Sequence, residues 1–244
     1  MQPGLFYCPC RTFVRSKQRM NIPTQDLSGN LQHIVNKVGA GERISDAEAL
    51  LLFEKGSLGL VGSLANAIRE KKHGDITYFN RNFHIEPTNV CVFSCNFCSY
   101  SRIYAHRDEG WELSQEQMMN IVKSYDGKPV TEVHIVGGVH PKMNLEFFAE
   151  LIRKVKQHRP DLHVKAFTAV ELDYMFRKAG KTIEEGLRYL REAGLDSLPG
   201  GGAEIFDAVI REQICADKAD LLYRNGLFRA YGEELKCWEQ PFAF

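Results

Sequence analysis

The sequence lacks the features that mark membrane, nucleic-acid-binding and secreted proteins. No run of about 18 apolar residues is present, so no segment predicts a membrane-spanning helix. Lys plus Arg and Asp plus Glu number 31 each, which leaves no excess charge to attract nucleic acid or an anionic membrane. The first residues also lack the apolar core of a secretory signal. We therefore expect a cytoplasmic protein that binds neither nucleic acid nor membrane.

The cysteines do not fit a disulfide scaffold. There are seven, an odd number, and three of them occupy positions 91, 95 and 98. Secreted scaffolds are normally shorter, with more evenly spread cysteines. The crowded spacing favours metal binding in a reducing compartment, whereas Cys215 and Cys237 stand alone and are predicted to be structural thiols. The length of 244 residues allows one large α/β domain.

The N-terminal part is expected to be an extension followed by a helical cap. Residues 1–43 form the extension and lead-in, and the basic first 19 residues suggest that the natural chain starts at Met20. Residues 44–82 form the cap, because Ser45-Asp-Ala-Glu48 has the pattern of a capping box. A second amphipathic stretch ends near Gly74.

From Phe83 onward, short apolar strands alternate with amphipathic helices. Strands are expected at 83–90, 132–136, 163–170 and 196–198, with helices starting near 114, 144, 182 and 204. This alternation predicts right-handed βαβ units and a parallel sheet whose active site lies at the carboxyl ends of the strands. A closed barrel needs about eight such units. We therefore predict a partial (β/α) barrel over residues 83–220 that lacks its later strands.

The run from Cys91 through Cys95 to Cys98 predicts an iron–sulfur site. Thiolates are the usual ligands of such clusters, and a C-x3-C-x2-C loop can wrap one corner of a [4Fe-4S] cubane. Three cysteines leave one iron without a protein ligand, and S-adenosylmethionine can chelate that iron. Structural zinc is one alternative, but it normally takes four ligands and no matching Cys/His pair follows. Buried structural thiols are the other alternative.

Several residues after the predicted strands are candidates for binding the cofactor. Gly137 and Gly138 would let their backbone approach the methionine end of S-adenosylmethionine, although such a pair is often only a turn. Thr168 and Glu171 could contact the ribose or the methionine end. The alternatives are a core threonine and a solvated glutamate.

Two further features could meet an anionic substrate. His140 follows a strand end, and its alternative reading is an exposed loop histidine. Gly200, Gly201 and Gly202 precede a predicted helix, where free amides would suit a carboxylate or phosphate. A plain tight turn is the alternative for these glycines.

Four runs of the sequence resemble the aminofutalosine synthase family of radical S-adenosylmethionine enzymes. They are His84–Cys91, Glu132–Pro141, Lys165–Asp173 and Gly194–Glu204, and the likeness covers roughly residues 44–220. By this resemblance, Cys91, Cys95 and Cys98 hold the cluster. Phe97 packs on the adenine, and Gly137 and Gly138 seat the cofactor.

The resemblance also implies a reaction in menaquinone biosynthesis. The 5′-deoxyadenosyl radical would add to the enol-ether double bond of 3-[(1-carboxyvinyl)oxy]benzoate, followed by aryl migration and loss of bicarbonate. The product would be 6-amino-6-deoxyfutalosine, with S-adenosylmethionine consumed as a substrate. The partners implied are this small-molecule substrate and an electron donor such as flavodoxin or ferredoxin. No residue is predicted to steer the rearrangement.

The tail at residues 221–244 departs from the family. It is aromatic-rich at its end and suggests a truncated or frame-shifted product that binds a cluster poorly or is unstable. Two alternative functions remain open. One is a radical enzyme like cyclic dehypoxanthinyl futalosine synthase, which abstracts hydrogen and releases free 5′-deoxyadenosine. The other is an inactive fragment that binds an iron–sulfur cluster or zinc.

Overall fold

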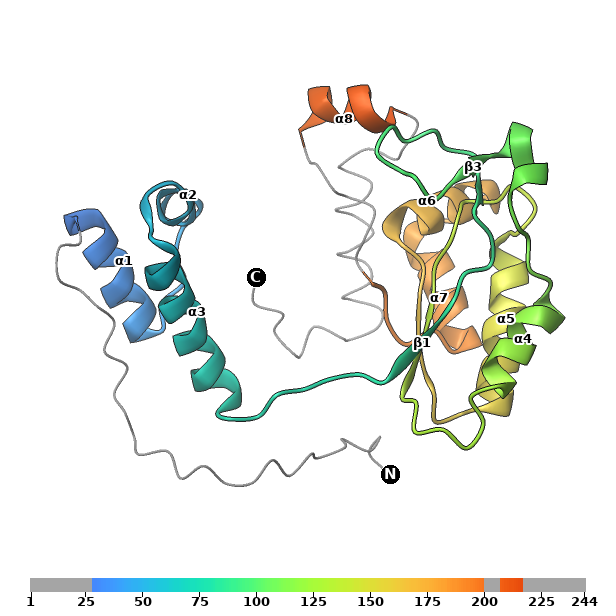
Figure 1. The fold of residues 1–244 in the computed structure, drawn as a ribbon, viewed down its shortest axis with the longest axis horizontal. Helices are drawn as coiled ribbons and strands as arrows, with labels where there is room; N and C mark the ends of the chain where they lie inside the picture. The colour runs from blue at the N-terminus through green and yellow to red at the C-terminus, as the bar shows by residue number, and fades with distance from the viewer. Residues whose placement is uncertain (1–27, 200–206, 217–244) are drawn as a thin grey trace. The chain divides into compact units, whose positions relative to one another are not determined.

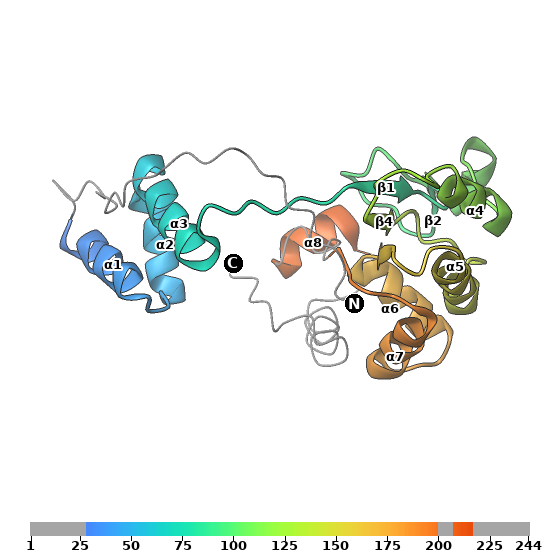
Figure 2. The same ribbon diagram turned by 90° about the horizontal axis from the view of Figure 1, so that it is seen from below.

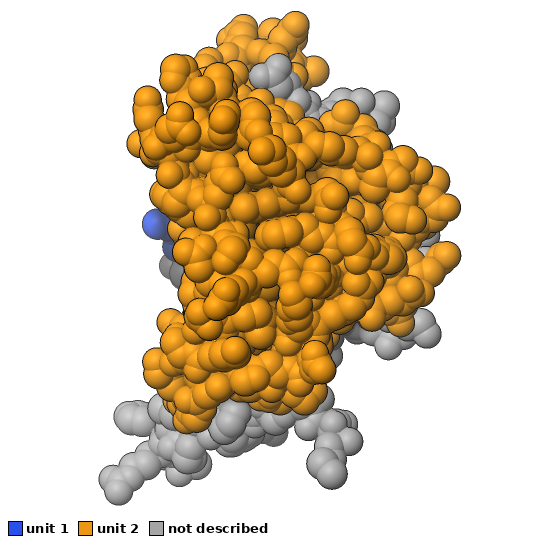
Figure 3. All heavy atoms as spheres, turned by 90° about the vertical axis from the view of Figure 1, so that its right-hand side faces the viewer, with its two compact units in different colours: residues 1–79 blue, residues 80–244 orange. Residues whose placement is uncertain are grey.

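The computed structural model describes residues 28–199 and 207–216. The predicted Gly200, Gly201 and Gly202, Cys237, the first 19 residues and the 221–244 tail lie outside these ranges. The chain divides into two compact units, residues 1–79 and 80–244, which Figure 3 distinguishes by colour. None of the described helices combines the length and the apolar composition that crossing a membrane requires.

The described part of the first unit consists of three helices, α1 (Gly29–Ala40), α2 (Asp46–Lys55) and α3 (Leu58–His73). The predicted capping box is present, since Ser45 and Glu48 each accept a hydrogen bond from the other's backbone amide. Leu31, Ile34 and Val35 of α1 pack against Leu60 and Leu64 of α3. Helix α1 lies in the range predicted as a lead-in, so the helical unit begins earlier than residue 44.

The second unit is built on a parallel sheet of three strands in the order β1-β4-β5, of which Figure 1 labels β1. These strands are β1 (Asn82–Ile85), β4 (Glu132–Ile135) and β5 (His163–Ala166). The strand predicted at 196–198 is reduced to one parallel bridge between Ser197 and Lys165. A separate short parallel pair joins β2 (Val90–Cys91) to β3 (Arg102–Ile103), followed by the 3-10 helix η1 (Tyr104–Glu109).

Helices of the second unit follow the strands, as the alternation predicts. They are α4 (Gln115–Lys123), α5 (Leu145–His158), α6 (Ala169–Lys178), α7 (Ile183–Ala193) and α8 (Ala208–Cys215). Helix α4 packs on α5, α5 on α7, and α7 on α6, an arc that Figure 2 displays. The parallel α/β class predicted from the sequence is thus confirmed.

One predicted strand is too long, and a helix was missed. The strand expected at 163–170 ends at Ala166, and α6 starts at Ala169. Thr168 and Glu171 form a capping box there, which satisfies the first amides of α6. The apolar run Ala166-Phe-Thr-Ala-Val170 reads as strand because its length suits either element. Thr168 and Glu171 therefore belong to a helix start rather than to a strand.

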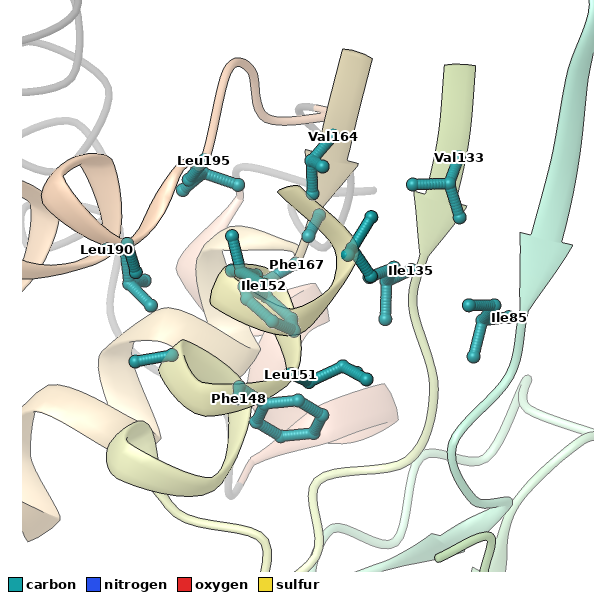
Figure 4. Packing of buried hydrophobic residues seen from close by; sticks show 14 of the residues in the cluster. Ile85, Val133, Ile135, Phe148, Leu151, Ile152, Val164, Phe167, Leu190 and Leu195 are labelled. Carbon is teal, nitrogen blue, oxygen red and sulfur yellow. The ribbon is translucent and has the colours of Figure 1, made fainter. Parts of the chain in front are cut away.

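The core lies between one face of the sheet and the helices. Ile85, Val133, Ile135 and Val164 point from the strands toward residues of α5, including Ile152 (Figure 4). Each of these five side chains is fully buried. The alternate strand positions, which face away from this core, carry polar residues. The sheet therefore has one apolar and one polar face.

Candidate functional site

The cysteine loop is fixed at both of its ends. Strands β2 and β3 pair in parallel, with Val90 opposite Arg102 and Cys91 opposite Ile103. The amide of Arg102 also donates to the carbonyl of Asn89 at 2.8 Å. The pairing holds the two ends of the loop together. The loop therefore consists of the ten residues between them, which include Cys95 and Cys98.

The sulfur of Cys91 lies where two backbone amides meet. Cys91 is buried, and its Sγ accepts hydrogen bonds from the amides of Phe93 and Val139, each at 3.4 Å. Val92 in turn donates to the carbonyl of Val139 at 2.9 Å. Amide donors directed at cysteine sulfur are one of the means by which proteins tune iron–sulfur clusters. The surroundings of Cys91 thus suit a cluster ligand.

Cys95 and Cys98 are half-buried thiols joined by a turn in which the Cys98 amide donates to the Cys95 carbonyl at 3.0 Å. Among the described residues, no three His, Cys, Asp or Glu side chains are grouped as ligands of a single metal ion. Thiolates are the usual ligands of iron–sulfur clusters, so the three cysteines of the loop are candidate ligands by their chemistry.

Gly137 and Gly138 allow the loop after β4 to approach the cysteine loop closely. A Cβ atom on Gly138 would lie 2.3 Å from the carbonyl oxygen of Val90, and one on Gly137 would lie 2.7 Å from that of Thr88. The amide of Gly138 donates to the same Thr88 carbonyl at 2.7 Å. The missing side chains are what bring Val139, the next residue, within reach of Cys91. Close packing against this backbone explains both glycines.

Glu171 connects the start of α6 to this glycine loop. Its Oε1 accepts the Gly137 amide at 3.1 Å, and its Oε2 accepts the amide and hydroxyl of Thr168 at 2.7 and 2.8 Å. The residue is 6% exposed, and burial raises the pKa of its carboxyl to about 7 against the opposing effect of these hydrogen bonds. The solvated-glutamate alternative is therefore wrong.

The backbone before Thr168 adopts an unusual conformation. Phe167 is the one non-glycine residue with positive φ among the described residues, at 65°. Its ring is fully buried and its amide donates to the carbonyl of Ile135 at 3.0 Å. A bulky residue in the left-handed region costs of order 1–3 kcal/mol and persists where its surroundings hold it. This bend turns the chain from β5 into α6 and sets the position of Glu171.

His140 is buried rather than exposed, so the alternative of an exposed loop histidine is wrong. Its side chain is 2% exposed. The amide of Lys142 donates to Nδ1 at 3.2 Å, and Nε2 lies 3.1 Å from Oε1 of Glu112. An acceptor at Nδ1 leaves the proton on Nε2, which then donates to the half-exposed carboxylate. Both nitrogens are thus engaged within the protein, and Glu112 is the group that faces outward.

A group of side chains near the carboxyl end of β1 was not predicted from the sequence. The hydroxyl of Tyr100 lies 3.4 Å from Oε2 of Glu86, and the indole of Trp111 donates to the Glu86 carbonyl at 3.1 Å. The pKa of Tyr100 is raised, mainly by burial and to a smaller extent by the nearby carboxylate of Glu86. Glu86 directly follows a strand, so the strand-end rule could have found it. Tyr100 and Trp111 lie in irregular segments that give no such signal.

Helix α8 contacts the cysteine loop through Asn96. The Asn96 side-chain amide donates to the Gln213 carbonyl and its backbone amide to the Ile214 carbonyl, both at 2.9 Å. Phe97, the next residue, is 48% exposed, which leaves part of its ring accessible to a ligand. The structure thus gathers Cys91, the two glycines, Thr168 and Glu171, whereas His140 turns toward Glu112.

The chain belongs to the radical SAM superfamily, because the model of that family matches residues 85–220. Membership implies an iron–sulfur cluster and S-adenosylmethionine as cofactors. The fold agrees. Methylornithine synthase matches with a TM-score of 0.61 and 20% identity, covering 82% of this chain and 55% of that one. The FeFe-hydrogenase maturase of Carboxydothermus hydrogenoformans matches with a TM-score of 0.63 and 18% identity, covering 84% and 46%.

Within the superfamily, the chain is related to enzymes of the futalosine route. It is 36% identical over 187 residues to aminodeoxyfutalosine synthase of Streptomyces coelicolor, covering 77% of this chain and 48% of the relative. It is 37% identical to the aminodeoxyfutalosine synthase of Thermus thermophilus, and this match covers 76% of this chain and 50% of the relative. Cyclic dehypoxanthine futalosine synthase of Halalkalibacterium halodurans is 33% identical, covering 77% and 50%. The predicted resemblance is confirmed, and the chain spans about half the length of these relatives.

Proposed function

We propose that the protein is a radical S-adenosylmethionine transferase that converts 3-[(1-carboxyvinyl)oxy]benzoate, S-adenosylmethionine and water into 6-amino-6-deoxyfutalosine, methionine and bicarbonate. The support is the 36–37% identity to two aminodeoxyfutalosine synthases, which extends over the cysteine loop and the strand ends around it. We assign Cys91, Cys95 and Cys98 as ligands of a [4Fe-4S] cluster. When bound, the reduced cluster supplies the electron that cleaves S-adenosylmethionine, which is consumed as a substrate.

The residues of this chain would then hold the reactants and keep the sulfur ligands in place. The half-exposed ring of Phe97 offers a surface on which the adenine can stack. Gly137 and Gly138 bring the Val139 amide to the Cys91 sulfur. The side chains of Thr168 and Glu171 are hydrogen-bonded to each other, and Glu171 also accepts the Gly137 amide. We therefore assign both residues a positioning role.

His140 takes a positioning role as well. Its Nδ1 is held by the Lys142 amide, so Nε2 is directed at Glu112 and fixes that carboxylate at the edge of the site. An anionic substrate would not approach His140 itself, because the imidazole is almost completely buried. The small-molecule substrate therefore meets other groups.

The test is anaerobic reconstitution followed by turnover with substrate, S-adenosylmethionine and a reductant such as reduced flavodoxin. Mass spectrometry should detect the larger adenosyl adduct. Free 5′-deoxyadenosine without adduct would instead favour hydrogen abstraction, as in a cyclic dehypoxanthine futalosine synthase, a relative that also matches. An EPR signal that does not change when S-adenosylmethionine is added would favour an inactive iron–sulfur fragment.

The cysteine assignment has its own test. Replacing Cys91, Cys95 or Cys98 individually by alanine should abolish the cluster absorbance and lower iron content to background. Cys215→Ala is the matched control, since Cys215 is also a buried thiol of this unit but lies on α8 outside the loop. A Cys98→Ala protein that keeps a full complement of iron would contradict the assignment.

A further inference from the structure

The polar face of the sheet presents a row of side chains that the proposed function does not use. His84 of β1, His134 of β4 and Lys165 of β5 are direct neighbours in the strand register. Strands of a parallel sheet are commonly apolar on both faces, because helices or a barrel interior cover them. Here the alternation is strict, and the polar positions coincide across all three strands. The polar row therefore needs a reason other than packing.

Most of the polar groups on this face are satisfied by one another. Oε1 of Glu132 lies 2.6 Å from Nζ of Lys165, and its two oxygens also accept hydrogen bonds from the side-chain amides of Asn80 and Asn82. His163 lies 2.6 Å from the hydroxyl of Ser197. The buried carboxylate of Glu132 is thus paired with Lys165 and two side-chain amides. In β4, Glu132 comes before His134 and therefore lies farther from the carboxyl end of the strand.

His134 is the exception. Among the described residues, its Nε2 is the one buried side-chain nitrogen or oxygen atom without a hydrogen-bond partner. A buried polar atom that is left unpaired costs about 1–3 kcal/mol, so such an atom is expected to meet a water molecule or a ligand. The ring of His84 lies beside it, with centroids 4.9 Å apart, and His84 is exposed. The row thus places a buried, unpaired atom beside an exposed imidazole ring.

The groups of the row are suited to an acceptor. Burial, then Lys165 and His84, lower the pKa of His134, which leaves a neutral imidazole that can donate one hydrogen bond. Lys165 carries three N–H donors, and its pair with Glu132 takes one of them. The acid on this face is already enclosed by its partners. A ligand that reaches the row therefore meets donors, which a carboxylate group can use.

We propose that His84, His134 and Lys165 form a binding site for a carboxylate group of the substrate. This deepens the proposed function and rests on it, because the proposed substrate carries two carboxylates. The row lies one residue before the carboxyl ends of its strands, the edge at which the glycine loop and Glu171 also lie. Binding there would pair the unsatisfied Nε2 of His134.

The test uses benzoate as the probe and benzamide as its neutral counterpart, with the full chain reconstituted anaerobically. Calorimetry should detect benzoate binding and markedly weaker benzamide binding. His84→Ala and His134→Leu should each weaken benzoate binding about tenfold or more, since each removes a hydrogen bond to a charged group. His84 is exposed, so its variant should fold even if that of His134 does not. His158→Gln is the control, because His158 lies on α5 and pairs with Asp126. This variant should bind benzoate as the parent does.

Two results would overturn the site. One is the absence of benzoate binding to the parent protein, and the other is unchanged affinity in the folded His84 and His134 variants. These outcomes are separate from those of the proposed function. If the parent forms the adduct but the variants bind benzoate with unchanged affinity, the carboxylate-binding site is refuted and the proposed reaction is not. Benzoate binding that depends on the row, without any adduct, would refute the proposed reaction alone.

Discussion

At the scale of single residues, the site depends on a short chain of contacts from Glu171 to Cys91. Glu171 holds the Gly137 amide, Gly138 lies against the backbone of Val90, and Val139 donates to the Cys91 sulfur. Each contact is made by an atom that has little freedom to move. A small change at one of these residues should therefore move the Cys91 sulfur.

Gly138→Ala should disturb this chain directly. Its methyl group would lie 2.3 Å from a backbone oxygen, which cannot rotate away, so overpacking should cost about 1–3 kcal/mol. We expect a lower thermal midpoint and less bound iron after reconstitution. Gly62→Ala is the control, because an added methyl on this residue of α3 meets no atom within 4 Å. Normal iron content in Gly138→Ala would show that the close approach does not position Cys91.

Glu171 should make stability depend on pH. Its pKa is about 7 in the folded protein, against an ordinary value of 4.5, so the folded state binds more protons between these values. Stability should then fall as pH rises from about 4.5 to about 7, by about 3 kcal/mol, and stay constant above that range. Glu171→Gln removes the titrating carboxyl, so the stability of the variant relative to the parent should rise between about pH 4.5 and about pH 7. Urea unfolding of the cluster-free chain at each pH measures the difference. Parallel pH profiles for the two proteins would contradict the raised pKa.

At the scale of elements, a short strand pair and the last turn of a helix hold the cysteine loop in place. The pairing of β2 with β3 closes the cysteine loop, and the last turn of α8 accepts two hydrogen bonds from Asn96 inside that loop. The two bonds of Asn96 to α8 join residues more than a hundred positions apart. They explain how the loop keeps its shape between strands that are only two residues long.

Asn96→Ala should loosen the cysteine loop. The variant loses the bond to the Gln213 carbonyl, which is worth about 0.5–1.5 kcal/mol, while the backbone bond to Ile214 remains. We expect iron to be released to a chelator several times faster than from the parent. Asn66→Ala, which removes an exposed amide on α3, should release iron at the parental rate. Equal rates in both variants would mean that α8 does not support the loop.

At the scale of the whole molecule, the chain consists of two units joined through a segment without helix or strand. Residues 75–81 have neither, and Ile76, Tyr78 and Phe79 expose 43%, 57% and 55% of their surface. The hydrophobic clusters of the two units have no residue in common. The cysteine loop belongs entirely to the second unit.

Brief chymotrypsin treatment should therefore cut after Tyr78 or Phe79, since both are exposed aromatic residues in an irregular segment. The fragment that begins at residue 79 or 80 should keep its iron, as the three cysteines and their supports lie within it. Mass spectrometry of the fragments and iron analysis after separation provide the measurement. Protection of this segment, or loss of iron on cleavage, would contradict the division into units.

The sequence by itself determined the superfamily and the class of fold. Thiolates at a fixed spacing predict a cluster, and alternating strands and helices predict parallel βα units, because both signals are local. The capping box at Ser45 is local too, and it is present. The capping box of α6 was overlooked because an apolar run preceded it, and that run suits a strand equally well.

Only the tertiary structure decided what the residues at the strand ends do. Gly138 is needed because the backbone of Val90, from a distant segment, lies against it. His140 and Glu171 are buried because other loops fold over them, and no local pattern reports such burial. The row of His84, His134 and Lys165 likewise exists only when three strands pair in register. Long-range pairing sets these environments, and so the roles of the residues within them.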